Sequence, residues 1–155
     1  MFFDTHAHYN DSKFDKERED ILNSLAENKV KYVVNIGTDI PSSEYSISMA
    51  EKYPFMYASV GFHPDSAHLV DDKSLLKLKE LCQHPKVVAI GETGLDYYWE
   101  TNPPKEIQQQ AFIKQIALAE EMDLPVIVHN RESTMDMINI LKETMPKKCI
   151  FIVHQ

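Results

Sequence analysis

Two kinds of hydrophobic pattern alternate along the chain. Short apolar runs rich in β-branched residues predict buried strands, and longer stretches with apolar residues every three or four positions predict helices. Strands are expected at residues 2–8, 31–36, 56–62, 87–91, 126–129 and 150–154. Helices are expected at residues 14–28, 42–52, 73–83, 105–121 and 134–144. Six strands alternating strictly with five helices predict βαβ units and a parallel sheet.

The fourth helix has the clearest pattern. Four of its residues share one helical face: Phe112, Gln115, Ile116 and Ala119. The fifth helix has an N-cap signal, because Ser133 stands three residues before Asp136.

Two parallel architectures fit this element order. A doubly wound sheet often has a glycine-rich first turn for a nucleotide, but the first strand here runs into Asp4-Thr5-His6-Ala7-His8 without a glycine. The pattern therefore favours an α/β fold, namely a parallel β/α (TIM-type) barrel. A full barrel needs eight strands and roughly 200 residues or more. We expect residues 1–155 to form a single domain, an incomplete barrel truncated at its C-terminal end.

Ligand-type side chains stand at the ends of five of the six apolar runs. These residues are His6, His8, His63, Glu92, His129 and His154. Active sites of β/α barrels lie at the C-terminal ends of the strands, so these side chains are expected to meet in one site.

Each of these residues also has a plainer interpretation. His6 and His8 are two positions apart on a strand, which directs both imidazoles to one face, although two exposed histidines near an N-terminus are common. Asp4 is also two positions from His6, so simple alternation puts it on the same face of the strand, one step deeper in the barrel. Glu92 has two oxygens that can bridge two cations, but it could be a surface loop residue. His129 and His154 fit metal ligands and hydrogen-bonded core histidines alike.

Two more residues are candidates for substrate contact. His63 precedes Pro64 after an apolar run, and it fits either a contact to a substrate phosphate or a loop-entry residue. Arg131 can bind a phosphate oxygen through its planar fork of donors. Arg131 and Asp96 could equally belong to structural ion pairs.

Imidazoles with a bridging carboxylate suit Zn²⁺ or Mn²⁺, and Mg²⁺ remains possible where a substrate supplies phosphate oxygens. One or two such ions would activate a water molecule as the nucleophile. No serine or cysteine has a base at a spacing that suggests a covalent nucleophile.

Composition narrows the class of protein. A formal net charge of −8 argues against a broad basic surface for nucleic acid, although bound cations would change the local field. No signal-peptide pattern or apolar run of membrane-spanning length is present, so no membrane partner is expected. Two distant cysteines suggest a reduced, cytoplasmic protein.

Four motifs resemble the TatD family of metal-dependent deoxyribonucleases. They are Asp4-Thr5-His6-Ala7-His8, Gly61-Phe62-His63-Pro64, Gly91-Glu92-Thr93-Gly94-Leu95-Asp96-Tyr97 and Leu124-Pro125-Val126-Ile127-Val128-His129-Asn130-Arg131. The final Val153-His154 matches the start of another. The order and spacing of the motifs agree over the whole chain.

The resemblance implies a β/α-barrel hydrolase that cleaves DNA phosphodiesters, often as a 3′–5′ exonuclease, with one or two divalent ions. It implies that His6 and His8 hold the first ion, that Glu92 bridges, that His129 and His154 hold the second, and that His63 contacts a substrate phosphate.

The chain departs from the family in length. Members are about a hundred residues longer, and an aspartate ligand of the first ion has no counterpart here. We therefore expect tighter metal binding at Glu92, His129 and His154 than at His6 and His8. An open barrel edge could also cause self-association. Two alternative functions stay open: a metal-binding but inactive fragment, and a hydrolase of C–N bonds.

Overall fold

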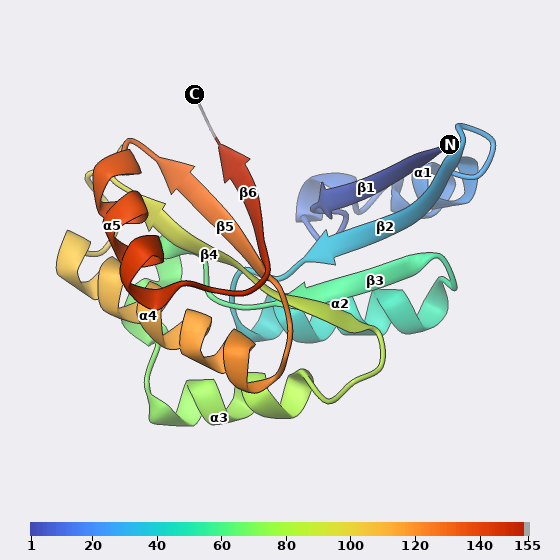
Figure 1. Ribbon diagram of the computed structural model, residues 1–155. Coiled ribbons are helices and arrows are strands. Elements are labelled where there is room, and N and C mark those ends of the chain that lie inside the picture. The colour runs from blue at the N-terminus through green and yellow to red at the C-terminus, as the bar shows by residue number, and fades with distance from the viewer. Residues whose placement is uncertain (154–155) are drawn as a thin grey trace.

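The computed structural model describes residues 1–153 of the chain. Its centre is one parallel sheet, whose strands pair in the order in which they occur in the sequence (Figure 1). The strands are β1 (Phe2–Ala7), β2 (Val30–Ile36), β3 (Met56–Val60), β4 (Val87–Asp96), β5 (Val126–Arg131) and β6 (Cys149–Val153). The sheet curls into a half-barrel of six strands, which confirms the incomplete TIM-type barrel predicted from the sequence.

A helix follows each of the first five strands and packs on the outer face of the sheet (Figure 1). These helices are α1 (Arg18–Ser24), α2 (Ile40–Lys52), α3 (Asp72–Leu81), α4 (Lys105–Glu121) and α5 (Thr134–Thr144). Two short 3₁₀ helices, η1 (Ser12–Phe14) and η2 (Pro64–Leu69), follow β1 and β3. No helix within residues 1–153 is long and apolar enough to cross a membrane.

The predicted helices at residues 105–121 and 134–144 are confirmed with these bounds, whereas the first helix is much shorter than the predicted 14–28. Ser133 does occupy the N-cap position of α5, but its side chain makes no cap hydrogen bond. Its hydroxyl instead lies within hydrogen-bond distance of two acceptors, the backbone oxygen of Leu95 at 3.0 Å and Asn130 Oδ1 at 2.7 Å, and shares its one proton between them. Ser133 therefore ties the start of α5 to the end of β4.

Strand β4 continues five residues past its predicted end at Gly91 and pairs with β5 as far as Asp96. Gly94 allows this extension, because a Cβ atom at that position would lie 2.1 Å from the carbonyl oxygen of His129. The backbone φ of Gly94 is +141°, which side chains rarely permit. The close approach of β4 to β5 brings Glu92 and Asp96 next to His129.

Strand β1 contains a β-bulge. Asp4 pairs with Val33 and Ala7 pairs with Asn35, so β1 has one more residue than β2 in this interval. A bulge interrupts the alternation of side chains between the two faces. Simple alternation therefore does not hold over the whole of this strand, and the placement of Asp4 on the face of His6 stays a prediction.

Two apolar clusters hold the half-barrel together. The larger one fills the space between the sheet and its helices and includes Leu22, Leu78 and Phe112. The smaller one lies on the three strands β2, β4 and β5 and contains Val34, Ile36, Ala89 and Ile127, with Ile152 of β6 packed against it. Large apolar side chains remain exposed on the edge strands, including Phe2 (65%) and Phe3 (58%) on β1 and Phe151 (49%) on β6.

Candidate metal centre

The ends of the strands surround a cavity of about 410 Å³ that is lined mainly by polar side chains. Its lining comprises His6, His8, Thr38, His63, Asp65, Glu92, Asp96, Trp99, Asn102, His129 and Arg131. The predicted site residues within the described part of the chain all line this one cavity. His154 lies outside the described residues.

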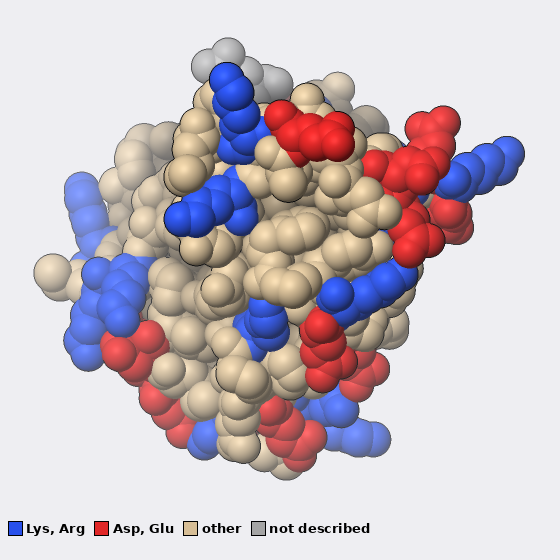
Figure 2. Space-filling model, turned by 90° about the vertical axis from the view of Figure 1, so that its right-hand side faces the viewer, with Lys and Arg blue, Asp and Glu red and all other residues tan. Residues whose placement is uncertain are grey.

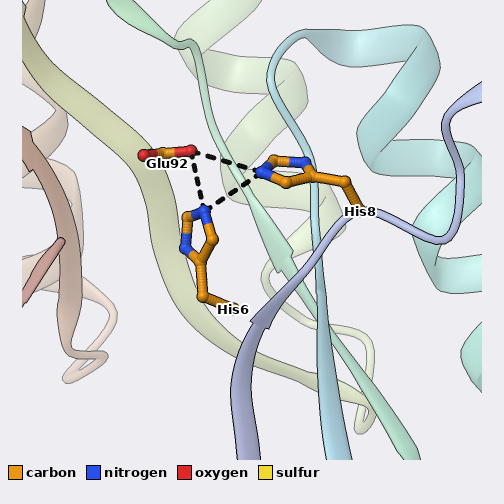
Figure 3. A group of neighbouring side chains, drawn as sticks. All are labelled: His6, His8 and Glu92. Carbon is orange, nitrogen blue, oxygen red and sulfur yellow. Dashed lines mark hydrogen bonds and ion pairs between the residues drawn. The ribbon is translucent and has the colours of Figure 1, made fainter. Parts of the chain in front are cut away.

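A first donor group comes from β1 and β4. The Nε2 atoms of His6 and His8 lie 3.0 Å apart, and they are 3.3 Å and 3.6 Å from Glu92 Oε2 (Figure 3). The nearby His6 and burial of the ring both lower the pKa of His8, with burial the larger effect. A neutral imidazole has a free ring nitrogen, which is the form that binds a metal ion.

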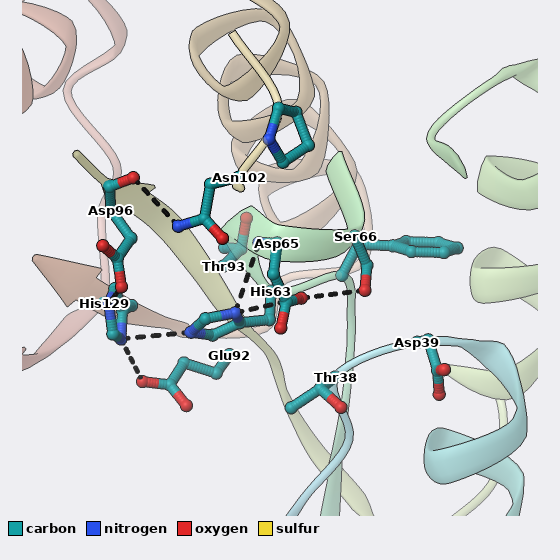
Figure 4. A network of polar contacts seen from close by, with 12 residues as sticks. Thr38, Asp39, His63, Asp65, Ser66, Glu92, Thr93, Asp96, Asn102 and His129 are labelled. Carbon is teal, nitrogen blue, oxygen red and sulfur yellow. Dashed lines mark hydrogen bonds and ion pairs between the residues drawn. The ribbon is translucent and has the colours of Figure 1, made fainter. Parts of the chain in front are cut away.

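A second donor group lies on the other side of the same carboxylate. His129 Nδ1 is 3.0 Å from Glu92 Oε1 and 3.3 Å from His63 Nε2 (Figure 4). His63 was expected to contact a substrate phosphate, but its ring nitrogen lies among the ligand-type atoms of this second group. Two histidines and a shared glutamate could therefore hold an ion here as well.

Glu92 connects the two donor groups and is only 2% exposed. Burial favours the neutral carboxyl form, but hydrogen bonds with His129 and His6 outweigh burial and hold the pKa of Glu92 well below its ordinary value. The side chain is therefore a carboxylate near neutral pH, with one oxygen toward each group. This arrangement suits a bridging ligand.

Asp96 orients His129 from behind. Its Oδ2 atom lies 3.0 Å from His129 Nε2, so a proton held on Nε2 makes Nδ1, on the side of Glu92, the nitrogen that could bind an ion. A carboxylate behind a ligating histidine fixes the ring and its tautomer in many metal sites. His63 is flanked in a similar way, because its Nδ1 atom lies 3.1 Å from Asp65 Oδ1.

Two buried glutamines of α4 hold the backbone segments that carry these side chains. Gln108 accepts from the backbone N–H of Asp96 at 2.8 Å and donates to its carbonyl at 3.0 Å. Gln115 makes the same pair of bonds with Phe62, at 2.8 Å and 3.1 Å, next to His63. Gln115 also donates to Thr93 Oγ1, beside Glu92. Helix α4 thereby positions both sides of the second donor group.

The residues present fit divalent cations. In each group the ligand-type atoms of two histidines and one glutamate lie within 4.8 Å of one another. Mixed imidazole and carboxylate donors suit Zn²⁺ or Mn²⁺. His6 Nδ1 is buried without a hydrogen-bond partner among residues 1–153. The polar contacts of this ring are therefore those of its Nε2 atom, which faces His8 and Glu92.

Arg131 lines the cavity, and its guanidinium lies over the rings of Tyr98 and Trp99. Asp96, Gln108 and Gln115 were not identified as parts of the site. The position of Asp96 just beyond an apolar run was the available signal. The sequence contained no such signal for the two glutamines, because the pattern of a helix does not show which backbone groups of other segments a side chain will contact.

Comparisons with known proteins identify the family of the chain. The family described as TatD related DNase matches residues 3–155. An uncharacterized metal-dependent hydrolase of Bacillus subtilis is 46% identical over 99% of this chain and 60% of its own length. A protein of Musicola paradisiaca named 3′-5′ ssDNA/RNA exonuclease TatD is 31% identical over 98% of this chain and 58% of its own length.

Among solved structures, a TatD homologue from Escherichia coli superposes with a TM-score of 0.86 at 32% identity. The alignment covers 94% of this chain and 57% of that protein. The chain thus spans between half and two thirds of the length of these relatives. It belongs to the TatD family of metal-dependent hydrolases.

Proposed function

We propose that the protein cleaves DNA phosphodiester bonds in a reaction that depends on divalent metal ions, acting on single strands or 3′ ends as a 3′–5′ exonuclease. The observation that carries the proposal is the position of Glu92, whose two oxygens face two separate pairs of histidines. Paired cation sites on a shared carboxylate are typical of enzymes that hydrolyse phosphate esters. A relative named as a 3′-5′ ssDNA/RNA exonuclease supports the choice of substrate.

In this proposal His6, His8 and Glu92 hold one ion, and Glu92 and His129 hold the other. His154 joins the second set by its match to the family motif, and the geometry adds His63 to the candidate ligands. Mg²⁺, Mn²⁺ and Zn²⁺ are all candidates. Bound ions would lower the pKa of a water molecule and stabilise the charge that develops on the phosphate.

The protein's own groups orient the substrate and the ligands. Asp96 holds His129 with Nδ1 toward Glu92, and Arg131 presents a planar set of donors at the cavity wall, suited to phosphate oxygens. The carboxylates of Glu92 and Asp96 are both almost fully buried. Buried charges of fixed orientation act more strongly on a reacting group than charges in water.

Two alternatives remain. One alternative is a hydrolase of C–N bonds. Such enzymes with related barrels often use a carboxylated lysine to bridge two metal ions, whereas no lysine is among the described residues that line this cavity. In our proposal Glu92 is the bridging group instead, which favours phosphodiester hydrolysis. The other alternative is a chain that binds metal without catalysing a reaction.

The test is cleavage of end-labelled single-stranded DNA by the purified chain with Mg²⁺, Mn²⁺ or Zn²⁺. We expect shortening from the 3′ end that EDTA abolishes and that Glu92→Ala reduces at least 100-fold. The exposed Glu143→Ala variant is the matched control and should cleave normally. Metal binding without any cleavage would favour the inactive fragment, and activity limited to amide substrates would favour the other enzyme.

We also expect residues 1–155 to form a single domain, the protein to work in the cytoplasm, and the second donor group to bind metal more tightly than the first.

A further inference from the structure

The chain contains a single tryptophan, and this residue lies at the wall of the metal cavity. Trp99 follows the end of β4, in the segment that leads to α4. Its side chain is 54% exposed although it is the largest apolar side chain of the protein. Arg131, Glu92 and His129 line the same cavity. An exposed indole is therefore next to the groups that would bind a phosphate and metal ions.

The neighbours of Trp99 restrict the orientation of its ring. The rings of Trp99 and Tyr98 are 4.7 Å apart at an angle of 88°, an edge-to-face contact. The guanidinium of Arg131 lies 3.9 Å from the centre of the Tyr98 ring and 5.3 Å from that of Trp99. The three side chains form a cluster in which the donors of Arg131 are held close to the indole.

The backbone of this segment is also fixed to the site. Asn102 N–H donates to the carbonyl of Trp99 at 3.1 Å and closes a turn. The side chain of Asn102 donates to the backbone oxygen of Asp96 (Figure 4). The backbone N–H of Tyr98 donates to Asp96 Oδ1. Since Asp96 also contacts His129, the position of Trp99 is coupled to that of the donor groups.

We infer that Trp99 is a stacking platform for a nucleobase of a single-stranded substrate, next to the phosphate contacted by Arg131. The inference rests on the proposed function and specifies how the substrate is held. Aromatic rings beside a backbone-binding groove stack on bases of any identity. The scarcity of positive charge supports this mode of binding: the net charge is −8, and positive and negative side chains are interspersed on the face drawn in Figure 2. Affinity for a nucleic acid must then come largely from contacts inside the site.

The test compares wild type with Trp99→Ala and Trp99→Phe on a set of fluorescently labelled (dA)5 strands. In each strand of the set one nucleotide is replaced by an abasic analogue, which keeps the phosphates and removes one base. Dissociation constants are measured by anisotropy with Ca²⁺ or with EDTA. The exposed Met135→Ala variant on α5 is the control, and circular dichroism checks the fold of each variant.

We expect Trp99→Ala to weaken binding of intact (dA)5 about ten-fold, and Trp99→Phe to have a much smaller effect. One abasic strand should bind wild type about ten-fold more weakly, and for that strand Trp99→Ala should cause no further loss. In the wild type, intact (dA)5 should quench the fluorescence of Trp99.

If Trp99→Ala weakened the binding of all strands equally, or of none, the inference would be overturned while the proposed function stayed in place. A wild-type protein that neither binds nor cleaves any of the strands would overturn the proposed function, and with it the stacking platform.

Discussion

Glu92 and Asp96 contact the same histidine from opposite sides and have different tasks. Glu92 lies on the side of His129 Nδ1 and faces both donor groups, whereas Asp96 lies at Nε2 and holds the ring. Burial lowers the pKa of His129, but its contacts with the two carboxylates outweigh burial and raise it. Metal binding at Nδ1 must therefore displace a proton that the metal-free site stabilises.

Replacing Asp96 should disturb the tautomer of His129. The amide of Asp96→Asn would donate to Nε2, which moves the ring proton to Nδ1, on the side of Glu92. We expect the affinity for Mn²⁺ or Zn²⁺ to fall by about 10–100-fold. Titration calorimetry measures the change, with the exposed Glu100→Gln as the control. Unchanged affinity in Asp96→Asn would show that Asp96 does not set the tautomer.

The low pKa of Glu92 predicts how stability depends on pH. A carboxyl group with a lowered folded-state pKa stabilises the folded protein above its ordinary value of 4.5, and this contribution is lost as the pH falls below 4.5 toward the folded-state pKa. The metal-free wild type should therefore lose more stability than Glu92→Gln between pH 6 and pH 3. Thermal unfolding in EDTA measures this. Parallel pH profiles for the two proteins would contradict the role of Glu92 as a stabilised carboxylate.

At the scale of elements, helix α4 both covers the sheet and positions the site. The sequence predicted its bounds and its buried face, including Gln115 beside Phe112 and Ile116. It did not predict what Gln115 does there, because its partners are backbone groups of Phe62, more than fifty residues away in the chain. The same limit explains why the contact of His63 with His129 could not be predicted. Hydrophobic periodicity indicates which face is buried, and polar contacts across the fold depend on how the elements pack.

Replacing Gln115 with leucine keeps the size of the buried side chain and removes its hydrogen bonds. The backbone N–H and carbonyl of Phe62 would lose these partners in the interior, so we expect the free energy of unfolding to fall by about 3 kcal/mol. Urea denaturation measures the loss. Gln110→Leu, at an exposed position of the same helix, should change stability little. Equal stability of the two variants would mean that the contacts of Gln115 are replaced at no cost.

At the scale of the whole molecule, the sheet has two open edges, β1 and β6, within residues 1–153. Strict alternation of strands and helices was enough to predict the parallel half-barrel and the gathering of histidines at one end. The bulge in β1 and the extension of β4 could not be predicted from alternation. Both depend on how one strand pairs with its neighbour, as the contact of Gly94 with the carbonyl of His129 shows.

The exposed aromatic residues of the edge strands predict association between molecules. We expect the purified chain to form dimers or larger species as its concentration rises, and Phe3→Glu or Phe151→Glu to shift the equilibrium toward the monomer. Sedimentation velocity measures the species. Met135→Glu, an exposed site on α5, is the control that should have no such effect. A wild type that stays monomeric at high concentration would rule out this association.

Anomalous diffraction from crystals soaked in Mn²⁺ tests whether Glu92 is shared by two cation sites. We expect two anomalous peaks, one between Glu92 and the pair His6 and His8, the other between Glu92 and His129, with the second filled first at limiting Mn²⁺. In crystals of Glu92→Ala both peaks should weaken together. A single peak on one side of Glu92 at saturating Mn²⁺, or peaks unaffected by the loss of Glu92, would contradict the claim.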